Sequence, residues 1–314
     1  VGARGDGIAD DTRAIQVALD AARGVPGGTV YVPPGTYVVT NVRLHAGVTL
    51  QGAGRNETTF KAKPAMTRAD RLIDDGAGHD YDGVVMFYVT YPAGKPHAGI
   101  TVRDFTVDGN ARGQNVDDPR GNGAKNLWGI YLNKVEGARV ENVTVRDCLN
   151  HGITLKESTR SVVRGVVVER NGQSIRRWRA AEGRPPGGDG LVLLSRCVGN
   201  VVEDSIAIEN GSVGFEDEGR FGRYQEDNRN RGNVWRSLRA EGNGDHGFLV
   251  LFADDTVLED VTSQRDAAGA HSAGISVVGT RRTRIAGARI VASHNAGLSA
   301  TPERKPRFFT AWIE

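Results

Sequence analysis

Apolar and polar residues follow two different spacings near the start of the chain. Over residues 10–23 the apolar positions recur three and four apart, which predicts one short amphipathic helix. Asp10, Asp11 and Thr12 offer side-chain acceptors to the free amides of its first turn. Residues 29–32 and 36–39 instead alternate with period two, which predicts short strands, and no second helical pattern follows.

From Gly99 onward, a glycine followed by alternating residues recurs along the chain. The repeated glycines are Gly129, Gly152, Gly190, Gly214, Gly247, Gly274 and Gly297. Their spacings are 23, 38, 24, 33, 27 and 23 residues, so the base period is near 23 and two intervals carry insertions, at 173–188 and 219–232. A second short strand precedes the glycine, as at 143–145, and repetition at such a period is typical of a solenoid.

A coil of this length cannot bury its own apolar face, but stacked coils share one continuous core. The sequence therefore predicts an all-β fold, a parallel β-helix that forms a single domain over residues 1–314. Residues 1–40 would form the cap and the first strands, with the helix covering the open end, and the clearest coils span 99–300. A β-sandwich is the competing all-β fold, but its strands need not repeat one glycine motif at a fixed period.

Composition and charge narrow the range of partners. The 314 residues carry 40 Lys and Arg against 38 Asp and Glu, a net charge of +2, so we expect no nucleic-acid partner. No apolar run approaches the roughly 18 residues of a membrane span, so we expect no membrane partner. Cys148 and Cys197 cannot form a disulfide framework and are expected to be small packing residues. The sequence leaves the oligomeric state open.

Several segments carry a family resemblance. Residues 2–7 (GARGDG), 10–12 (DDT) and 27–37 (GGTVYVPPGTY) resemble the cap and first coils of the pectate-lyase-like right-handed β-helix superfamily. From 102–110 through the coils to about Ala300, the chain is most similar to the mannuronan C5-epimerases of that superfamily. The resemblance implies a right-handed β-helix, a carbohydrate ligand across the parallel sheet, and a secreted or extracellular protein whose leader is absent from this chain. The fold hosts lyases, epimerases and hydrolases, so it does not fix the chemistry.

The functional positions of these families are partly replaced. In the epimerases one coil has a tyrosine before its glycine and Asp-Pro-His two residues after it, where this chain has His151, Thr154 and Lys156. The aspartate expected from the next coil falls on Leu194. Residues 186–190 and 245–247 are similar to polygalacturonase segments, but Ser212 and Val213 stand at that family's paired aspartates. The catalytic motifs of both families are therefore not retained.

Alternation of side chains places two columns of residues outward, two and four positions after each glycine. The first column comprises Tyr131, Thr154, Val192, Glu216, Leu249, Ser276 and Ser299, and the second Asn133, Lys156, Leu194, Glu218, Leu251 and Val278. The position before the glycine holds Trp128, His151, Asp189, Val213 and His246. Because adjacent coils lie about 4.8 Å apart, the ionisable residues of three neighbouring coils should form one patch. We predict as catalytic residues His151, Lys156, Asp189, Glu216 and Glu218.

The two insertions flank this patch, and both are basic with aromatic residues. The predicted substrate-binding residues are Tyr131, Arg176, Arg177, Trp178, Arg220, Arg223, Tyr224 and His246. Arginine forks suit carboxylates and aromatic rings stack on sugars, so the pattern indicates an acidic polysaccharide or oligosaccharide as the partner. The alternative is a pair of solvated loops whose arginines pair with local acids.

Other residues have structural explanations. A ladder that satisfies turn backbones is predicted at Asn150, Asn171, Asn210 and Asn243. His246 lies beside Leu249 and also fits a half-buried histidine whose hydrogen bonds are satisfied. Asp217 should point inward, so either the register slips there or Asp217 binds an arginine or a metal. No metal site is predicted, although Glu216 and Glu218 could hold Ca²⁺ as a cofactor.

Three functions fit this pattern. The first is a polysaccharide lyase or epimerase, in which loop arginines neutralise a uronate, Lys156 or His151 abstracts the proton beside its carboxylate, and the other serves as the acid. The second is a glycoside hydrolase that uses Asp189, Glu216 and Glu218 as general acid and as base or nucleophile. The third is a saccharide-binding β-helix without turnover. In each case the ligand is expected between the coils of Gly152 and Gly247.

Overall fold

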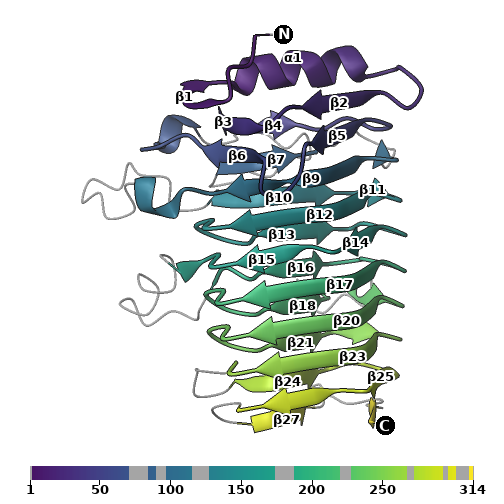
Figure 1. Ribbon diagram of the computed structural model, residues 1–314. Coiled ribbons are helices and arrows are strands. Elements are labelled where there is room, and N and C mark those ends of the chain that lie inside the picture. Colours follow the sequence, from purple (N-terminus) through teal and green to yellow (C-terminus); the bar gives the residue numbers. More distant parts are fainter. Residues whose placement is uncertain are drawn as a thin grey trace.

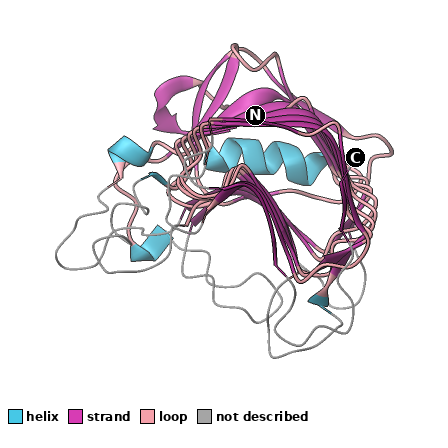
Figure 2. Cartoon of the chain, turned by 90° about the horizontal axis from the view of Figure 1, so that it is seen from below, coloured by secondary structure: helices cyan, strands magenta, loops and turns pink. Residues whose placement is uncertain are grey.

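The computed structural model describes residues 2–70, 84–89, 97–114, 127–173, 187–219, 228–266, 272–292, 296–301 and 311–313. Over these ranges the chain winds into a stack of coils, with helix α1 (Thr12–Ala22) across the N-terminal end (Figure 1). Viewed along the axis, the strands of successive coils superimpose and α1 spans the stack (Figure 2). The prediction of an all-β parallel solenoid with a short helical cap is confirmed.

Two long parallel sheets run the length of the stack. Among the described residues, sheet A has 15 strands: β1 (Asp6–Asp10), β2 (Thr29–Val32), β3 (Gly35–Val39), β5 (Thr49–Gly52), β6 (Thr58–Ala62), β9 (Thr101–Asp108), β12 (Arg139–Arg146), β14 (Val162–Arg164), β15 (Val167–Glu169), β17 (Val201–Ile208), β20 (Val234–Glu241), β23 (Val257–Gln264), β25 (Thr283–Ala286), β26 (Arg289–Val291) and β28 (Ala311–Ile313). Over the same ranges sheet B has nine: β4 (Val42–Arg43), β7 (Val84–Tyr88), β10 (Leu127–Asn133), β13 (Ile153–Lys156), β16 (Leu191–Leu194), β18 (Phe215–Glu218), β21 (Phe248–Leu251), β24 (Ala273–Val278) and β27 (Ala296–Thr301).

Short elements join the two sheets at the edges of the coils. Strand β8 (His97–Ala98) pairs with β11 (Val135–Glu136), and β19 (Asn230–Arg231) pairs with β22 (Ala253–Asp254). Two 3-10 turns, η1 (Arg68–Asp70) and η2 (Ala111–Gly113), complete the elements that the structure describes. None of the helices in this part of the chain is long and apolar enough to cross a membrane.

The repeated glycines mark where neighbouring coils approach most closely. A Cβ atom on Gly152 would lie 2.7 Å from the carbonyl oxygen of Gly190, and one on Gly190 would lie 2.6 Å from that of Gly214. A Cβ on Gly214 would lie 2.7 Å from the carbonyl oxygen of Gly247. No side chain fits at such a distance from rigid backbone, so the close approach explains why each coil repeats a glycine at this place.

Apolar side chains of one coil stack on those of the next inside the solenoid. The register partners Phe215 and Phe248 stack with ring centroids 5.3 Å apart. Phe60 meets Phe105 edge-on at a centroid distance of 5.0 Å. Cys148 and Cys197 are buried in the same core and form no disulfide, as expected. The coils therefore share one continuous core, which a single coil could not provide.

The cap forms as predicted, but one aspartate has another role. The side chain of Asp10 accepts a hydrogen bond from the Thr12 amide at 3.0 Å, at the start of α1. Asp11 makes no side-chain cap; its carboxylate accepts from the amides of Arg4 at 2.8 Å and Gly5 at 3.2 Å. Asp11 therefore holds the N-terminal segment against the cap and does not accept a hydrogen bond from the free amides of the helix.

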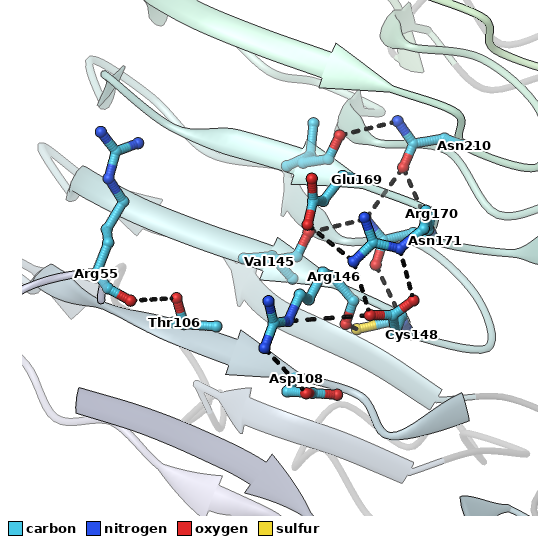
Figure 3. A network of polar contacts seen from close by, with 12 residues as sticks. Arg55, Thr106, Asp108, Val145, Arg146, Cys148, Glu169, Arg170, Asn171 and Asn210 are labelled. Carbon is cyan, nitrogen blue, oxygen red and sulfur yellow. Dashed lines mark hydrogen bonds and ion pairs between the residues drawn. The ribbon is translucent and has the colours of Figure 1, made fainter. Parts of the chain in front are cut away.

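The predicted asparagine ladder runs along one edge of the coils. The Nδ2 atom of Asn171 donates to Oδ1 of Asn210 at 3.1 Å (Figure 3), and Asn210 donates to Asn243 at 2.9 Å. Asn243 then donates to Asp266, where the ladder ends on a buried carboxylate. At the other end of the ladder the Cys148 amide donates to Oδ1 of Asn171. Cys148 therefore occupies the position next to Asn171 at which the sequence predicts Asn150.

Asp217 is a buried carboxylate inside the solenoid. It pairs in regular register with Leu193 and Val250, so the register does not slip. Its oxygens accept hydrogen bonds from Asn230 (2.6 Å), Asn233 (3.1 Å), Trp235 (3.3 Å) and Thr256 (2.9 Å). The expectation of an arginine partner is wrong, because these donors are neutral, and within the described ranges no metal-ligating cluster includes Asp217. Burial raises the pKa of Asp217, although the four hydrogen bonds oppose that shift.

Candidate active site

The outward columns of sheet B lie in the register that the glycines predict. Tyr131 pairs with Thr154, Thr154 with Val192, and Val192 with Glu216. The second column continues from Lys156 through its partners in the same way to Glu218. The intervening side chains belong to the core, so both columns lie on the outer face. The register prediction is confirmed.

His151 and Asp189 precede the adjacent strands β13 and β16, and their side chains meet on this face. Nδ1 of His151 lies 2.8 Å from Oδ2 of Asp189. The same nitrogen lies 3.1 Å from the backbone N–H of Asp189. One ring nitrogen cannot donate and accept together, and the contact with the carboxylate is the shorter and the charged one, so we assign Nδ1–H as a donor to Oδ2. With the proton on Nδ1, Nε2 is left without a proton to donate, and the His151 side chain is 25% exposed.

Asp189 is held in its anionic form. Its side chain is buried, and Oδ1 accepts a hydrogen bond from the Val213 amide at 3.0 Å. Burial raises the pKa of Asp189, but the charge and hydrogen bond of His151 and the Val213 amide outweigh it and lower that pKa to about 2. Because both carboxylate oxygens are engaged, the geometry fits Asp189 to positioning His151 better than to direct proton transfer.

Glu216 lies one coil further along, on β18, and is hydrogen-bonded to Asp189. Burial, followed by the charges of Asp189 and Glu218, raises the pKa of Glu216 well above its usual range. The pKa values of two neighbouring carboxyl groups are therefore shifted apart, down for Asp189 and up for Glu216, which is the arrangement by which a site can provide an acid beside a base.

Asp245 joins this cluster and was not among the predicted site residues. Its charge contributes to the raised pKa of Glu216, and its carboxylate accepts a hydrogen bond from the hydroxyl of Ser272. The sequence signal for Asp245 is the Asp-His-Gly segment at 245–247, of which the sequence predicts only His246 as a site residue.

Lys156 ends β13 beside a group of cations. Its Nζ lies 3.9 Å from Glu157, which also contacts Lys134 at 3.8 Å and Arg196 at 2.7 Å. Three cations thus surround one carboxylate at the edge of sheet B, which leaves local positive charge for an anionic sugar. Lys134 and Arg196 were missed from the sequence because they follow their strands and do not belong to the outward columns.

His246 occupies the same place in its coil as His151 but is buried. Its Nδ1 lies 2.8 Å from the amide nitrogen of Ala273 and 3.1 Å from the carbonyl oxygen of that residue, and we assign Nδ1 as the acceptor in the shorter contact. Nε2 lies 3.6 Å from Asp245. A structural role for His246 fits these contacts, and its predicted contact with substrate stays a prediction.

The remaining predicted substrate contacts divide into two groups. Tyr131 lies on the outer face and is buried. The others lie outside the described residues: Arg176, Arg177, Trp178, Arg220, Arg223 and Tyr224. Arg229, at the end of the second insertion, is buried and bound to Asp254 at 2.7 Å, so this arginine has a structural role. Over the described ranges no three His, Cys, Asp or Glu side chains gather as a metal site, and Ca²⁺ binding at Glu216 and Glu218 stays untested.

This fold and site define a pectate-lyase-like β-helix protein. Residues 1–181 match the family described as "Rhamnogalacturonase A/epimerase, pectate lyase-like". The match covers more than half of the chain, which therefore belongs to this family.

Individual relatives refine the comparison. Mannuronan C5-epimerase AlgE6 of Azotobacter vinelandii is 32% identical over 227 residues, which cover 68% of this chain and 22% of that protein. Alginate lyase 7 of the same organism is 28% identical over 230 residues, again 68% of this chain and 22% of the relative. The chain thus spans about a fifth of the length of these relatives.

Solved structures support the fold. The A-module of Azotobacter vinelandii AlgE6 superposes with a TM-score of 0.56 at 18% identity, covering 100% of this chain and 96% of that module. An iota-carrageenase of family GH82 from A. fortis gives a TM-score of 0.57 at 15% identity, with 90% and 56% of the two chains covered. At these identities the likeness concerns the β-helix alone.

Proposed function

We propose that this chain is a carbohydrate-active enzyme that removes the proton beside the carboxylate of a uronate in a polysaccharide, as a lyase or a C5-epimerase. The pair of His151 and Asp189 on the outer face of sheet B carries this proposal, since it supplies an oriented base. The relatives named mannuronan C5-epimerase and alginate lyase support a uronate polysaccharide as the substrate. A secreted or extracellular location goes with such a substrate.

The base in this proposal is Nε2 of His151. It accepts the proton on C5 of the uronate, and the carboxylate of Asp189 stabilises the imidazolium that forms. The electron pair of the broken C–H bond moves into the uronate carboxylate, which becomes more negative. Lys156 is placed to neutralise that charge together with Lys134 and Arg196, which lie at the same edge of sheet B.

The acid is the protonated carboxyl of Glu216, with the ammonium of Lys156 as the other candidate. In β-elimination the C4–O4 bond breaks, the acid gives its proton to O4, and an unsaturated uronate remains. In epimerisation the acid returns a proton to C5 from the opposite face and no bond between sugars breaks. Both reactions share the first step, so the same pair of residues serves either one.

The experiment measures whether the proton on C5 of the uronate exchanges with solvent. The purified chain is incubated in D₂O with oligomannuronate, oligogalacturonate and glycosaminoglycan fragments, and H5 signals, unsaturated uronate and reducing ends are measured. Loss of H5 signals without chain cleavage would identify an epimerase, and unsaturated product would identify a lyase. The absence of both from a broad acidic panel would refute the proposal.

A glycoside hydrolase is the second candidate, and the opposite pKa shifts of Glu216 and Asp189 favour it. Both oxygens of Asp189 are engaged, so Glu218 would have to serve as the base or nucleophile. Glu216 and Glu218 lie two positions apart on β18, about 6.6 Å along the backbone, near the carboxyl separation of roughly 6.5 to 9.5 Å that accompanies inversion. Reducing ends without unsaturated product would select this candidate, and binding without any product would select a non-catalytic saccharide-binding protein.

A further inference from the structure

Two buried oxygen atoms on the outer face of sheet B have no hydrogen-bond partner among the described residues. They are Oγ1 of Thr154 and Oδ1 of Asn133, and each residue is 1% exposed. Buried polar atoms almost always find a partner, and each exception needs an explanation. Their neighbours Ile153, Leu155 and Leu132 point into the core, so the side chains of both residues lie on the outer face.

The two oxygens lie on adjacent strands of the candidate site. Thr154 on β13 is the register partner of Tyr131 on β10, and Asn133 is the register partner of Lys156. Adjacent strands lie about 4.8 Å apart, so the unpaired oxygens and the Lys156 side chain share one small area.

An aromatic pair and the proposed base border the same area. The rings of Trp128 and Tyr131 lie edge to face, with centroids 6.4 Å apart. The amide of Gly129 donates to the carbonyl of His151 at 3.1 Å, so Trp128 and His151 stand on neighbouring coils. Aromatic rings beside unpaired polar atoms are the typical lining of a sugar site, because rings cover C–H groups and the polar atoms bind hydroxyls.

We infer that Asn133 and Thr154 form a subsite for the free hydroxyl groups of a pyranose ring, at or next to the uronate that His151 attacks. A sugar hydroxyl donates to Oδ1 of Asn133, and Oγ1 of Thr154 donates to or accepts from a second hydroxyl. The inference rests on the proposed function for the sugar at His151. It adds that the ring must carry unesterified hydroxyls, since an O-acetyl group has no proton for Asn133.

A site of this kind predicts opposite effects on folding and on binding. Thr154→Val keeps the shape of the side chain and removes the unpaired hydroxyl. The free protein should melt about 1 to 3 °C higher, because an unsatisfied buried group is removed. Affinity for a mannuronate or galacturonate tetrasaccharide should fall about 5- to 10-fold, because the hydrogen bond to the sugar is lost. Both are measured in a His151→Ala background, which prevents turnover, by thermal unfolding and by calorimetry.

Thr280 supplies the matched control. Its Oγ1 is also buried and has no partner in the described part of the chain, but Thr280 lies two residues beyond β24, four strands from β13 in sheet B. Thr280→Val should raise the melting temperature in the same way and leave the affinity unchanged. A second measurement needs no change at Thr154: an O-acetylated tetrasaccharide should bind several-fold more weakly than the deacetylated one.

The outcomes separate the two proposals. If Thr154→Val and Thr280→Val bind equally well, or acetylation has no effect, the subsite is wrong and the proposed function stands. If Thr154→Val weakens binding but the wild type neither exchanges H5 nor makes unsaturated product, the subsite stands and the proposed function fails. If no tetrasaccharide of the panel binds, both are overturned.

Discussion

The two histidines that precede repeated glycines, His151 and His246, hold the same place in their coils and have different neighbours. The next coil presents Asp189 to His151 and Ala273 to His246. In both coils a backbone amide of that next residue points at Nδ1, at 3.1 Å and 2.8 Å. A carboxylate oxygen also lies 2.8 Å from Nδ1 of His151, whereas among the described residues none is recorded at Nδ1 of His246. Under the proposed function, this one side chain in the following coil distinguishes the histidine that serves as the base from the one that does not.

The largest effect expected from this difference is on turnover. His151→Ala should lower kcat by about 10³-fold, the range of a lost general base, whereas His246→Ala should lower it less than about 10-fold. Both variants are assayed on the substrate that the D₂O experiment identifies. Equal losses of kcat in the two variants would contradict this difference, since the two histidines would then act alike.

The next effect concerns the carboxylate itself. Asp189→Asn keeps the shape of the side chain but cannot hold the imidazolium, so kcat should fall about 10²-fold while KM changes little. Asp255→Asn is the control, because Asp255 forms an exposed ion pair with Arg282 away from the site. Full activity of Asp189→Asn would mean that the neighbour of His151 is irrelevant.

The sequence predicted this contact in part. The glycines set the register, so His151 and Asp189 were placed on adjacent coils across a 38-residue interval. Alternation along a strand gives the face of a side chain but not its rotamer, so it could not show that the carboxylate turns toward Nδ1. The same limit explains why the sequence predicts Asp189 as a catalytic acid or base and not as a positioning residue.

Contacts made across the coil were harder to predict. Asp217 was placed inward correctly, but its donors Asn230, Asn233 and Thr256 come from the short segments between the two long sheets, whose geometry no periodicity describes. The sequence could not predict the unpaired oxygen of Thr154 either, because whether an atom lacks a hydrogen-bond partner depends on the positions of all its neighbours. Period and alternation therefore define a solenoid and its faces, whereas the chemistry depends on side-chain directions.

A variant in the core separates an effect on stability from an effect on kcat. Asp217→Asn places an amide NH₂ among four donors, so the free energy of unfolding should fall by about 2 kcal/mol, as measured in urea. The protein that remains folded should keep its kcat, since Asp217 faces away from His151. A fall in kcat as large as that of Asp189→Asn would show that the site responds to any disturbance of the coil.

The smallest effect is a dependence of stability on pH at Glu216, between the two histidine coils. Its raised pKa means that above about pH 4.5 the folded chain keeps a proton that the unfolded chain releases, so its contribution to stability falls as pH rises. Glu216→Gln removes this pH-dependent contribution. The free energy of unfolding of the variant, relative to that of the wild type, should therefore increase by at least about 1 kcal/mol between about pH 5 and about pH 8. If the difference in the free energy of unfolding between the two proteins is the same at both pH values, the raised pKa of Glu216 is contradicted.

The central claim is that Asp189 holds the Nδ1 proton of His151, and the tautomers of the two rings test it without any substrate. Long-range ¹H–¹⁵N spectra distinguish a protonated Nδ1 from a protonated Nε2 in a neutral imidazole. We predict the Nδ1–H tautomer for His151 and the Nε2–H tautomer for His246, with His151 changing to Nε2–H in Asp189→Ala. A neutral His151 that carries its proton on Nε2 in the wild type would contradict the account.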